Sequence, residues 1–109
     1  MNQKTGARHG NPNVVYYALA ATEYGKAGSS TCNSTLGNKT GSGCIFHDVT
    51  LGDNDAPCTG SISCYLDGGK IGVLSKSDSS YQPAFAATTG WDFSTGIGTI
   101  NVDNLINAW

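Results

Sequence analysis

The sequence predicts a small α/β fold with two short helices, a few strands and long loops held by disulfides. Two segments carry apolar residues at helical spacing, one stretch is rich in β-branched and aromatic residues, and the connecting segments are rich in Gly, Ser, Thr and Asn. The chain has 109 residues and shows no internal repeat or domain boundary. We therefore treat residues 1–109 as a single region with a thin core.

The first helix is expected over residues 12–23. Asn11 suits the N-cap, and Pro12 suits the first helical position, where its missing N–H is not needed. Gly25 is the expected stop. The apolar residues that follow at helical spacing are Val14, Tyr17, Ala18 and Ala21. They predict a short amphipathic helix.

The remaining helix and strands are expected after residue 43. Residues 44–52 form the best strand candidate, and residues 70–74 form a second, shorter one. Residues 25–43 and 53–69 have the composition of loops and turns. Asn101 is the predicted cap of a final helix. One face of that helix would carry Val102, Leu105, Ile106 and Trp109.

The composition argues against two classes of partner. The chain has six Lys and Arg residues and eight Asp and Glu residues, a formal charge of −2. Binding to nucleic acid or to an anionic membrane would favour a basic face, and this balance does not point to one. Charged residues are 13% of the chain, and no apolar run is long enough to span a membrane. Met1 is followed by polar residues and not by an export signal.

The four cysteines form two local pairs. Their spacing in a Gly-rich, weakly charged chain favours the disulfides Cys32–Cys44 and Cys58–Cys64, although four cysteines allow three connectivities. A zinc site of four thiolates, or of three with His47, is the competing interpretation, and it lacks close C-x2-C knuckles. Paired cysteines without an export signal suggest an extracellular protein whose beginning is missing from this chain.

No catalytic constellation is visible in the sequence. There is no Gly-x-Ser-x-Gly elbow, His9 lies in a polar stretch, and His47 and Asp48 are strand neighbours that point to opposite faces. The run Asp53-Asn54-Asp55 resembles the start of an EF-hand loop. It fails at the positions that require Gly and Glu, where Cys58 and Cys64 stand.

Oxygen ligands for a hard cation remain a possibility for Asp48 and Asp92. Calcium takes six to eight oxygens from carboxylates, carbonyls and water, so glycine-flanked turns can supply a site with few acids. Asp48 ends the predicted strand, and Asp92 lies in the turn Gly90-Trp91-Asp92. Taken from the residues alone, the alternative that both carboxylates cap turns or strand ends is preferred.

Three stretches make the chain resemble the C-terminal part of the sedolisin, or serine-carboxyl, peptidases of family S53. Residues 46–52 (FHDVTLG) resemble the family's Phe-x-Asp-Ile-Thr-x-Gly segment, and residues 90–98 (GWDFSTGIG) its Gly-Trp-Asp-x-x-Thr-Gly-Leu-Gly segment. Residues 2–12 resemble the stretch just after the helix of the catalytic serine. The resemblance implies a fragment of a subtilisin-like fold.

In that family the two conserved-looking segments build one structural calcium site. The resemblance therefore implies a Ca²⁺ ion that stabilises the fold. The implied ligands are the carboxylates of Asp48 and Asp92 and the carbonyls of Val49, Gly90 and Thr88. Thr88 departs from the family, which has glycine there.

The same resemblance implies that the family's catalytic residues are not part of this chain. The family's nucleophile lies in a Ser-Gly-Thr-Ser segment, which is absent, and its Glu and Asp partners would lie before Met1. The chain is expected to have no catalytic residue of its own and to need the missing N-terminal part of a peptidase as its partner. Exposed apolar surface in such a fragment would also favour self-association.

A second function remains open, namely a small secreted, disulfide-held module without metal. Such a module would use exposed Tyr and Trp side chains for a carbohydrate or a protein partner. Burial of both Trp91 and Trp109 would remove its main support.

Overall fold

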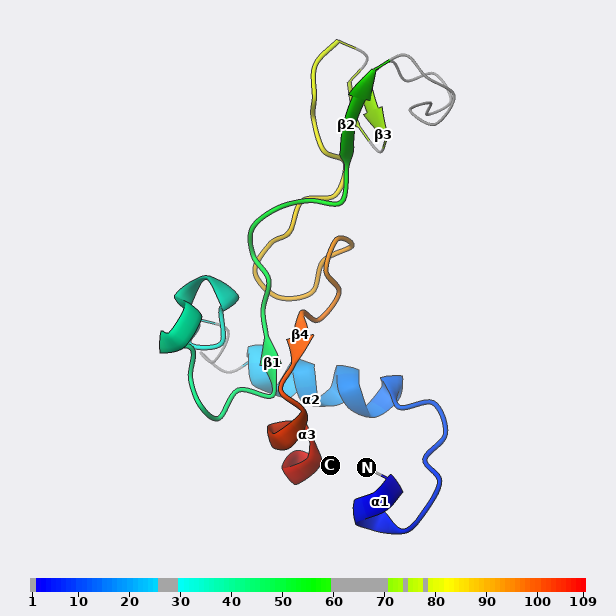
Figure 1. Cartoon of the computed structure of the whole chain (residues 1–109), viewed down its shortest axis with the longest axis vertical. Helices are drawn as coiled ribbons and strands as arrows, with labels where there is room; N and C mark the ends of the chain where they lie inside the picture. Colours follow the sequence, from blue (N-terminus) through cyan, green and yellow to red (C-terminus); the bar gives the residue numbers. More distant parts are fainter. Residues whose placement is uncertain (1, 26–29, 60–70, 74, 78) are drawn as a thin grey trace.

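The computed structural model describes residues 2–25, 30–59, 71–73, 75–77 and 79–109. Their helices and strands form a small mixed α/β arrangement in which β1 pairs with β4 and β2 pairs with β3, both antiparallel (Figure 1). The helical elements are α1 (Asn2–Thr5), α2 (Asn13–Gly25), the 3₁₀ helix η2 (Ser34–Lys39) and α3 (Val102–Ala108). The strands are β1 (Phe46–His47), β2 (Ala56–Thr59), β3 (Ile71–Val73) and β4 (Thr99–Ile100).

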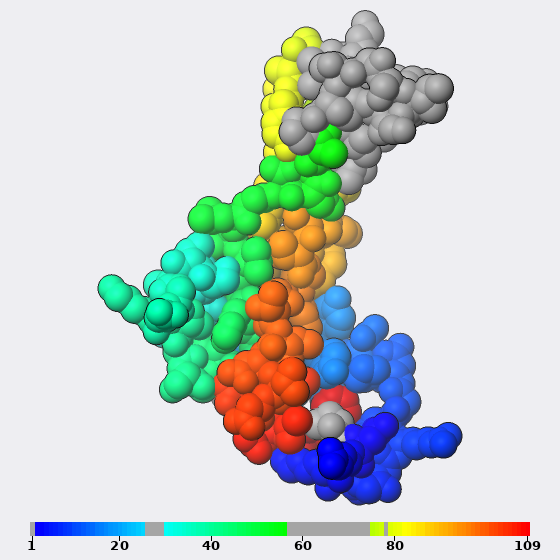
Figure 2. Space-filling view, viewed as in Figure 1, coloured from blue at the N-terminus to red at the C-terminus, as the bar shows by residue number. Residues whose placement is uncertain are grey.

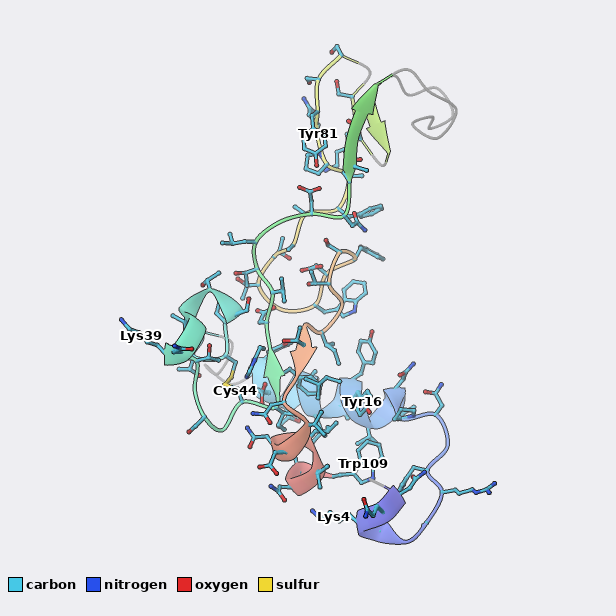
Figure 3. The ribbon with its side chains drawn as sticks, in the orientation of Figure 1. Lys4, Tyr16, Lys39, Cys44, Tyr81 and Trp109 are labelled. Atoms are coloured by element: carbon cyan, nitrogen blue, oxygen red, sulfur yellow. A yellow bond between two sulfur atoms is a disulfide. The ribbon has the colours of Figure 1, made fainter. Side chains whose placement is uncertain are left out.

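The core lies where α2, β1 and α3 meet. Phe46 is fully buried, and Ala20 and Leu105 are almost so. Around them pack the half-buried side chains of Tyr16, Leu19, Tyr24, Ile45, Ile97 and Trp109. Tyr16 and Trp109 meet edge to face, with ring centroids 5.8 Å apart (Figure 3). This core is small for 109 residues.

The start of α2 is confirmed, but its packed face is not the predicted one. The N–H of Asn13 donates to Oδ1 of Asn11 at 3.0 Å, as expected for an N-cap. The predicted apolar stripe is instead exposed, and Val14 keeps 79% of its surface in solvent. The exposed members are Val14, Tyr17, Ala18 and Ala21.

The carboxylate of Glu23 explains which face of α2 turns inward. It accepts the N–H groups of Ile45 at 2.7 Å and Phe46 at 2.9 Å, so it fixes the helix against the beginning of β1. The side of α2 that carries Leu19 and Ala20 then meets the core. Because α2 is apolar on more than one side, periodicity alone could not choose between its faces.

The final helix follows its prediction closely. Oδ1 of Asn101 accepts the N–H of Asn104 at 3.2 Å, which confirms the cap. Leu105 is buried and Ile106 and Trp109 are half-buried, but Val102 is 62% exposed. The prediction that Val102 lies on the packed face is wrong: it begins the helix, and no other element of the described structure covers the first turn.

The predicted strand over residues 44–52 is shorter than expected. Only Phe46–His47 is a strand, because its partner β4 is confined between the turn at Gly98 and the cap at Asn101. Within residues 70–74, Ile71–Val73 is a strand, as predicted. Its partner β2 lies in residues 53–69, which were wrongly expected to be turns throughout, and η2 lies in the segment expected to be loop.

The predicted disulfide Cys32–Cys44 is present, and both residues are buried. A zinc site that uses these two thiols is therefore excluded. The disulfide holds residues 32–34 beside Asp48, whose N–H donates to Cys32 O at 2.9 Å and whose carbonyl accepts the N–H of Ser34 at 2.8 Å. The second predicted pair, Cys58–Cys64, cannot be followed because Cys64 lies outside the described residues.

The molecule is elongated. Its radius of gyration is 17.7 Å and its extents are 52 × 32 × 22 Å. In the middle of the molecule the segments near residues 52 and 87 run side by side, joined by a bond from Ala87 N–H to Gly52 O at 2.9 Å (Figure 2). A compact domain of this length has a radius of gyration of about 13 Å.

Candidate metal centre

The β1–β4 pairing brings the two predicted acidic segments together. Asp48 follows β1 directly, and the turn that carries Asp92 precedes β4 (Figure 1). Because the strands are antiparallel, the chain leaving β1 runs beside the chain entering β4. Two carboxylates from distant parts of the sequence thereby become neighbours, and both residues are buried.

The Asp48 carboxylate is held at one oxygen and unpaired at the other. The residue is 0% exposed. Oδ2 accepts the N–H of Gly90 at 2.8 Å, whereas Oδ1 is buried and has no hydrogen-bond partner among the residues that the structure describes. A buried carboxylate oxygen without a partner costs stability unless a proton or a cation neutralises it.

The Asp92 carboxylate is surrounded by backbone donors. Oδ2 accepts the N–H of Thr88 at 2.8 Å, and Oδ1 accepts those of Ser94 at 2.8 Å and Thr95 at 2.7 Å. The turn also closes on itself through mutual bonds between the backbones of Asp92 and Gly96. This loop therefore has a defined shape that the carboxylate itself organises.

Thr95 joins the Asp92 turn to the segment after β1. Its hydroxyl lies 3.3 Å from the carbonyl oxygen of Val49 and 3.1 and 3.2 Å from the two carboxylate oxygens of Asp92. The sequence did not single out Thr95 as a site residue. Its position three residues after Asp92, where a hydroxyl can return to an Asp side chain, is the signal that could have found it.

The two carboxyls have opposite shifts in pKa. Burial raises the pKa of Asp48; the Gly90 N–H opposes this, and the negative charge of Asp92 adds to it. For Asp92 burial also raises the pKa, but the N–H groups of Thr88, Thr95 and Ser94 together hold it below the usual 3.8. Ionised Asp92 therefore supports the fold and loses that effect as pH falls. Ionised Asp48 opposes the fold as pH rises above the ordinary carboxyl range.

A hard cation placed between these two segments would have to bind mainly to oxygen. Among the described residues there is no group of three or more His, Cys, Asp and Glu side chains that could hold a metal. The two carboxylates would therefore need backbone oxygens to complete a site, which is a usual arrangement for calcium. Of the residues implied by the resemblance, the structure brings Asp48, Val49, Gly90, Thr88 and Asp92 into one neighbourhood.

The contacts of both histidines fit structural roles. His47 pairs with Thr99 in the β1–β4 ladder, and His9 contacts the hydroxyl of Thr5 at 2.6 Å and the ring of Trp109. The EF-hand-like run continues directly into β2, and Oδ1 of Asp53 accepts the N–H of Asp55 at 2.9 Å.

An aromatic cluster lies next to the Asp92 turn. Trp91 is 48% exposed. The centroid of its ring lies 4.7 Å from the ring centroid of Phe93, and the ring centroids of Phe93 and Phe85 are 5.4 Å apart. The indole N–H of Trp91 donates to the hydroxyl of Tyr17 at 3.4 Å. The cluster borders a hollow of about 420 Å³ that also includes Lys76 and Thr88. Trp109, by contrast, packs against the core.

Comparisons with known proteins leave the family open. No protein-family model matches the chain, and no match was found among curated proteins or among solved structures. None of the helices in the described part of the chain has the length and apolar character needed to cross a membrane.

Proposed function

We propose that this chain is the calcium-binding C-terminal portion of a secreted sedolisin-type serine-carboxyl peptidase, with a subtilisin-like parent fold. The observation that carries the calcium role is the fully buried Oδ1 of Asp48, which has no partner within the described part of the chain and lies near a second buried carboxylate, that of Asp92. The peptidase origin rests on the resemblance of residues 46–52 and 90–98 to that family.

The residues that would hold the ion come from two segments. Asp48 and Val49 follow β1, and Gly90 and Asp92 belong to the turn before β4. Thr88 would add a backbone carbonyl. An ion held by both segments would neutralise the two carboxylates and link the turn to the strand. Its role is structural, and the chain is not catalytic alone. Peptide hydrolysis would require the missing N-terminal part of the peptidase.

Calcium should raise the midpoint of thermal unfolding of this chain. An ion that binds only the folded form stabilises it by about 2.7 kcal/mol at a hundredfold excess over its dissociation constant. That corresponds to a rise of roughly 10 °C or more for a region of this size. Scanning calorimetry with calcium and with chelator measures the difference.

Matched variants separate this site from general charge effects. Asp48→Ala and Asp92→Ala should abolish the calcium-dependent rise. Asp103→Ala, which removes an exposed aspartate from α3, should keep it. A midpoint that does not respond to calcium in the wild type would contradict the proposal, and so would a response that survives in both site variants.

The exposed aromatic cluster supports a second candidate function, a small secreted binding module without metal. Trp91 keeps the exposure that this function needs, although Trp109 does not. Exposed Trp and Phe rings beside polar groups suit stacking on sugar rings. In this case oligosaccharides should change the fluorescence of the wild type, with calcium absent, and should not change that of Trp91→Ala. An unchanged spectrum across a panel of sugars would remove this candidate.

A further inference from the structure

The carboxylate of Asp55 is buried, and no described residue donates a hydrogen bond to it. The residue is 9% exposed, and neither Oδ1 nor Oδ2 has a partner in the part of the chain that the structure describes. At Asp48 one oxygen is held by the N–H of Gly90, whereas at Asp55 both oxygens lack such a bond. A buried ionised carboxylate costs stability unless a proton or a cation neutralises it. Asp55 therefore has a whole carboxylate available to a ligand.

Asp55 lies just before β2, beside Tyr81 (Figure 3). Asp53 pairs with Ala86 in an isolated antiparallel bridge, so the chain before β2 runs beside the chain that follows Tyr81. The Tyr81 hydroxyl donates to Oδ1 of Asp53 at 2.7 Å and lies 3.4 Å from the carbonyl oxygen of Asp55. Oxygen atoms from two distant segments thus meet at one place.

The carboxylates of Asp53 and Asp55 share the neighbourhood of the Tyr81 hydroxyl. Oδ1 of Asp53 accepts the N–H of Asp55 at 2.9 Å, which bends the chain between the two residues. The pKa of Tyr81 is raised to about 12, first by the hydrogen bond to Asp53, then by burial and by the negative charges of both aspartates. Both carboxylates are therefore close enough to act on the same hydroxyl. Two such negative charges disfavour each other unless a cation lies near both.

The donors around Asp55 select a hard cation. Carboxylate, carbonyl and hydroxyl oxygens are the ligands that calcium and magnesium prefer. Magnesium demands a near-ideal octahedron, whereas calcium accepts both oxygens of one carboxylate within an irregular set of ligands. Because both oxygens of Asp55 are without a described partner, calcium is the better fit.

We propose that Asp53 and Asp55 form a second calcium site, in which Asp55 binds the ion through both carboxylate oxygens and Asp53 through one. The site shares no ligand with the candidate centre at Asp48 and Asp92, so the proposal stands apart from the proposed function. The site differs from an EF-hand, because β2 begins at Ala56, where an EF-hand loop would continue.

An ion at this site should stabilise the molecule locally. The strands β2 and β3 pair with each other at one end of the elongated molecule, away from the core at α2, β1 and α3 (Figure 1). Regions of one protein can open separately, each with its own free energy. We expect the β2–β3 end to open before the core unfolds. Its ion is then released first and does not change the unfolding midpoint that tests the Asp48 site.

Isothermal titration calorimetry with calcium counts the ions. The wild type should bind two, and Asp48→Asn and Asp55→Asn should bind one each. Asp53→Asn keeps an oxygen that can accept from Tyr81 and removes one charge, so it should weaken the second site by about tenfold or more. Circular dichroism without calcium should show all variants folded. The control Asp103→Asn, an exposed residue of α3, should still bind two.

The two sites fail in different ways. A single ion that is lost in Asp48→Asn and kept in Asp55→Asn would overturn the second site. A single ion that is kept in Asp48→Asn and lost in Asp55→Asn would support the second site and contradict the proposed function. Unchanged affinity in both Asp53→Asn and Asp55→Asn would also overturn the second site.

Terbium luminescence tests where the second ion lies. Terbium is a hard cation that replaces calcium, and an excited tyrosine close to it transfers energy to it. In Asp48→Asn protein, excitation of the tyrosines should give terbium emission. Adding Tyr81→Phe should remove most of this emission, whereas adding Tyr16→Phe, a change in the core, should keep it. Emission that does not depend on Tyr81 would place the ion elsewhere and overturn the proposal.

Discussion

Replacing Asp48 with Asn should leave the calcium-free protein as stable as the wild type, or more stable, while removing all stabilisation by calcium. Without an ion, the ionised Asp48 carboxylate is buried, and the negative charge of Asp92 disfavours it further. Asn keeps an oxygen that can accept the N–H of Gly90 and removes the charge. Removing this buried charge should stabilise the folded protein by about 1–3 kcal/mol. That gain offsets what the substitution loses in other contacts.

In saturating calcium the order should reverse. The wild type would gain about 2.7 kcal/mol at a hundredfold excess over its dissociation constant, and the Asp48→Asn variant would gain nothing. Asp48→Asn should therefore be the more stable protein in chelator and the less stable one in calcium. Urea unfolding at neutral pH in the two buffers measures the difference.

Asp92→Asn provides the matched comparison. The Asp92 carboxylate accepts three backbone N–H groups, and these lower its pKa, so its charge stabilises the calcium-free fold. This variant should lose stability in both buffers. If Asp48→Asn also lost stability without calcium, the Asp48 carboxylate would be acting as a cap and not as a cation ligand.

Replacing Gly98 with Ala should destabilise the protein by about 3 kcal/mol or more, from overpacking and an unfavourable backbone conformation together. Gly98 has a φ of +79°, and a Cβ there would lie 2.2 Å from the carbonyl oxygen of His47. The obstacle is the backbone of β1, which cannot rotate away as a side chain could. An Ala at this position should therefore push β1 away from β4, and with it Asp48 away from the Asp92 turn.

Gly96 supplies the control for Gly98 within the same turn. Its φ is +65°, but an added Cβ would meet nothing within 4 Å. Gly96→Ala should therefore lose only about 1 kcal/mol, the cost of a non-glycine residue in the left-handed region. Equal losses for the two variants in urea unfolding would show that conformational strain, and not the close approach to His47, decides the effect.

The two glycine variants also report on the candidate metal centre. Gly98→Ala should weaken calcium binding as well as stability, because it separates β1 from β4. Gly96→Ala changes only the turn. A protein that lost the β1–β4 contact and still bound calcium with full affinity would not hold the ion between the segments described here.

Local signals in the sequence determined where α2 and α3 begin and one disulfide. Asn11 and Asn101 cap their helices because a side-chain oxygen needs only an N–H two or three residues ahead. Cys32 and Cys44 are also near in the sequence, twelve residues apart, and form a disulfide across that short loop. Each of these features depends on a few neighbouring residues, so residue type and spacing were sufficient.

The tertiary structure alone decided which face of α2 is buried, how short the strands are, and where β2 lies. The choice of helix face depends on Glu23 meeting the start of β1, a contact between segments far apart in the sequence. The approach of Asp48 to Asp92 likewise needed the β1–β4 pairing. The residue pattern of a segment indicates which interactions that segment can make. It does not indicate which distant segment it will contact, and the features above depend on those long-range contacts.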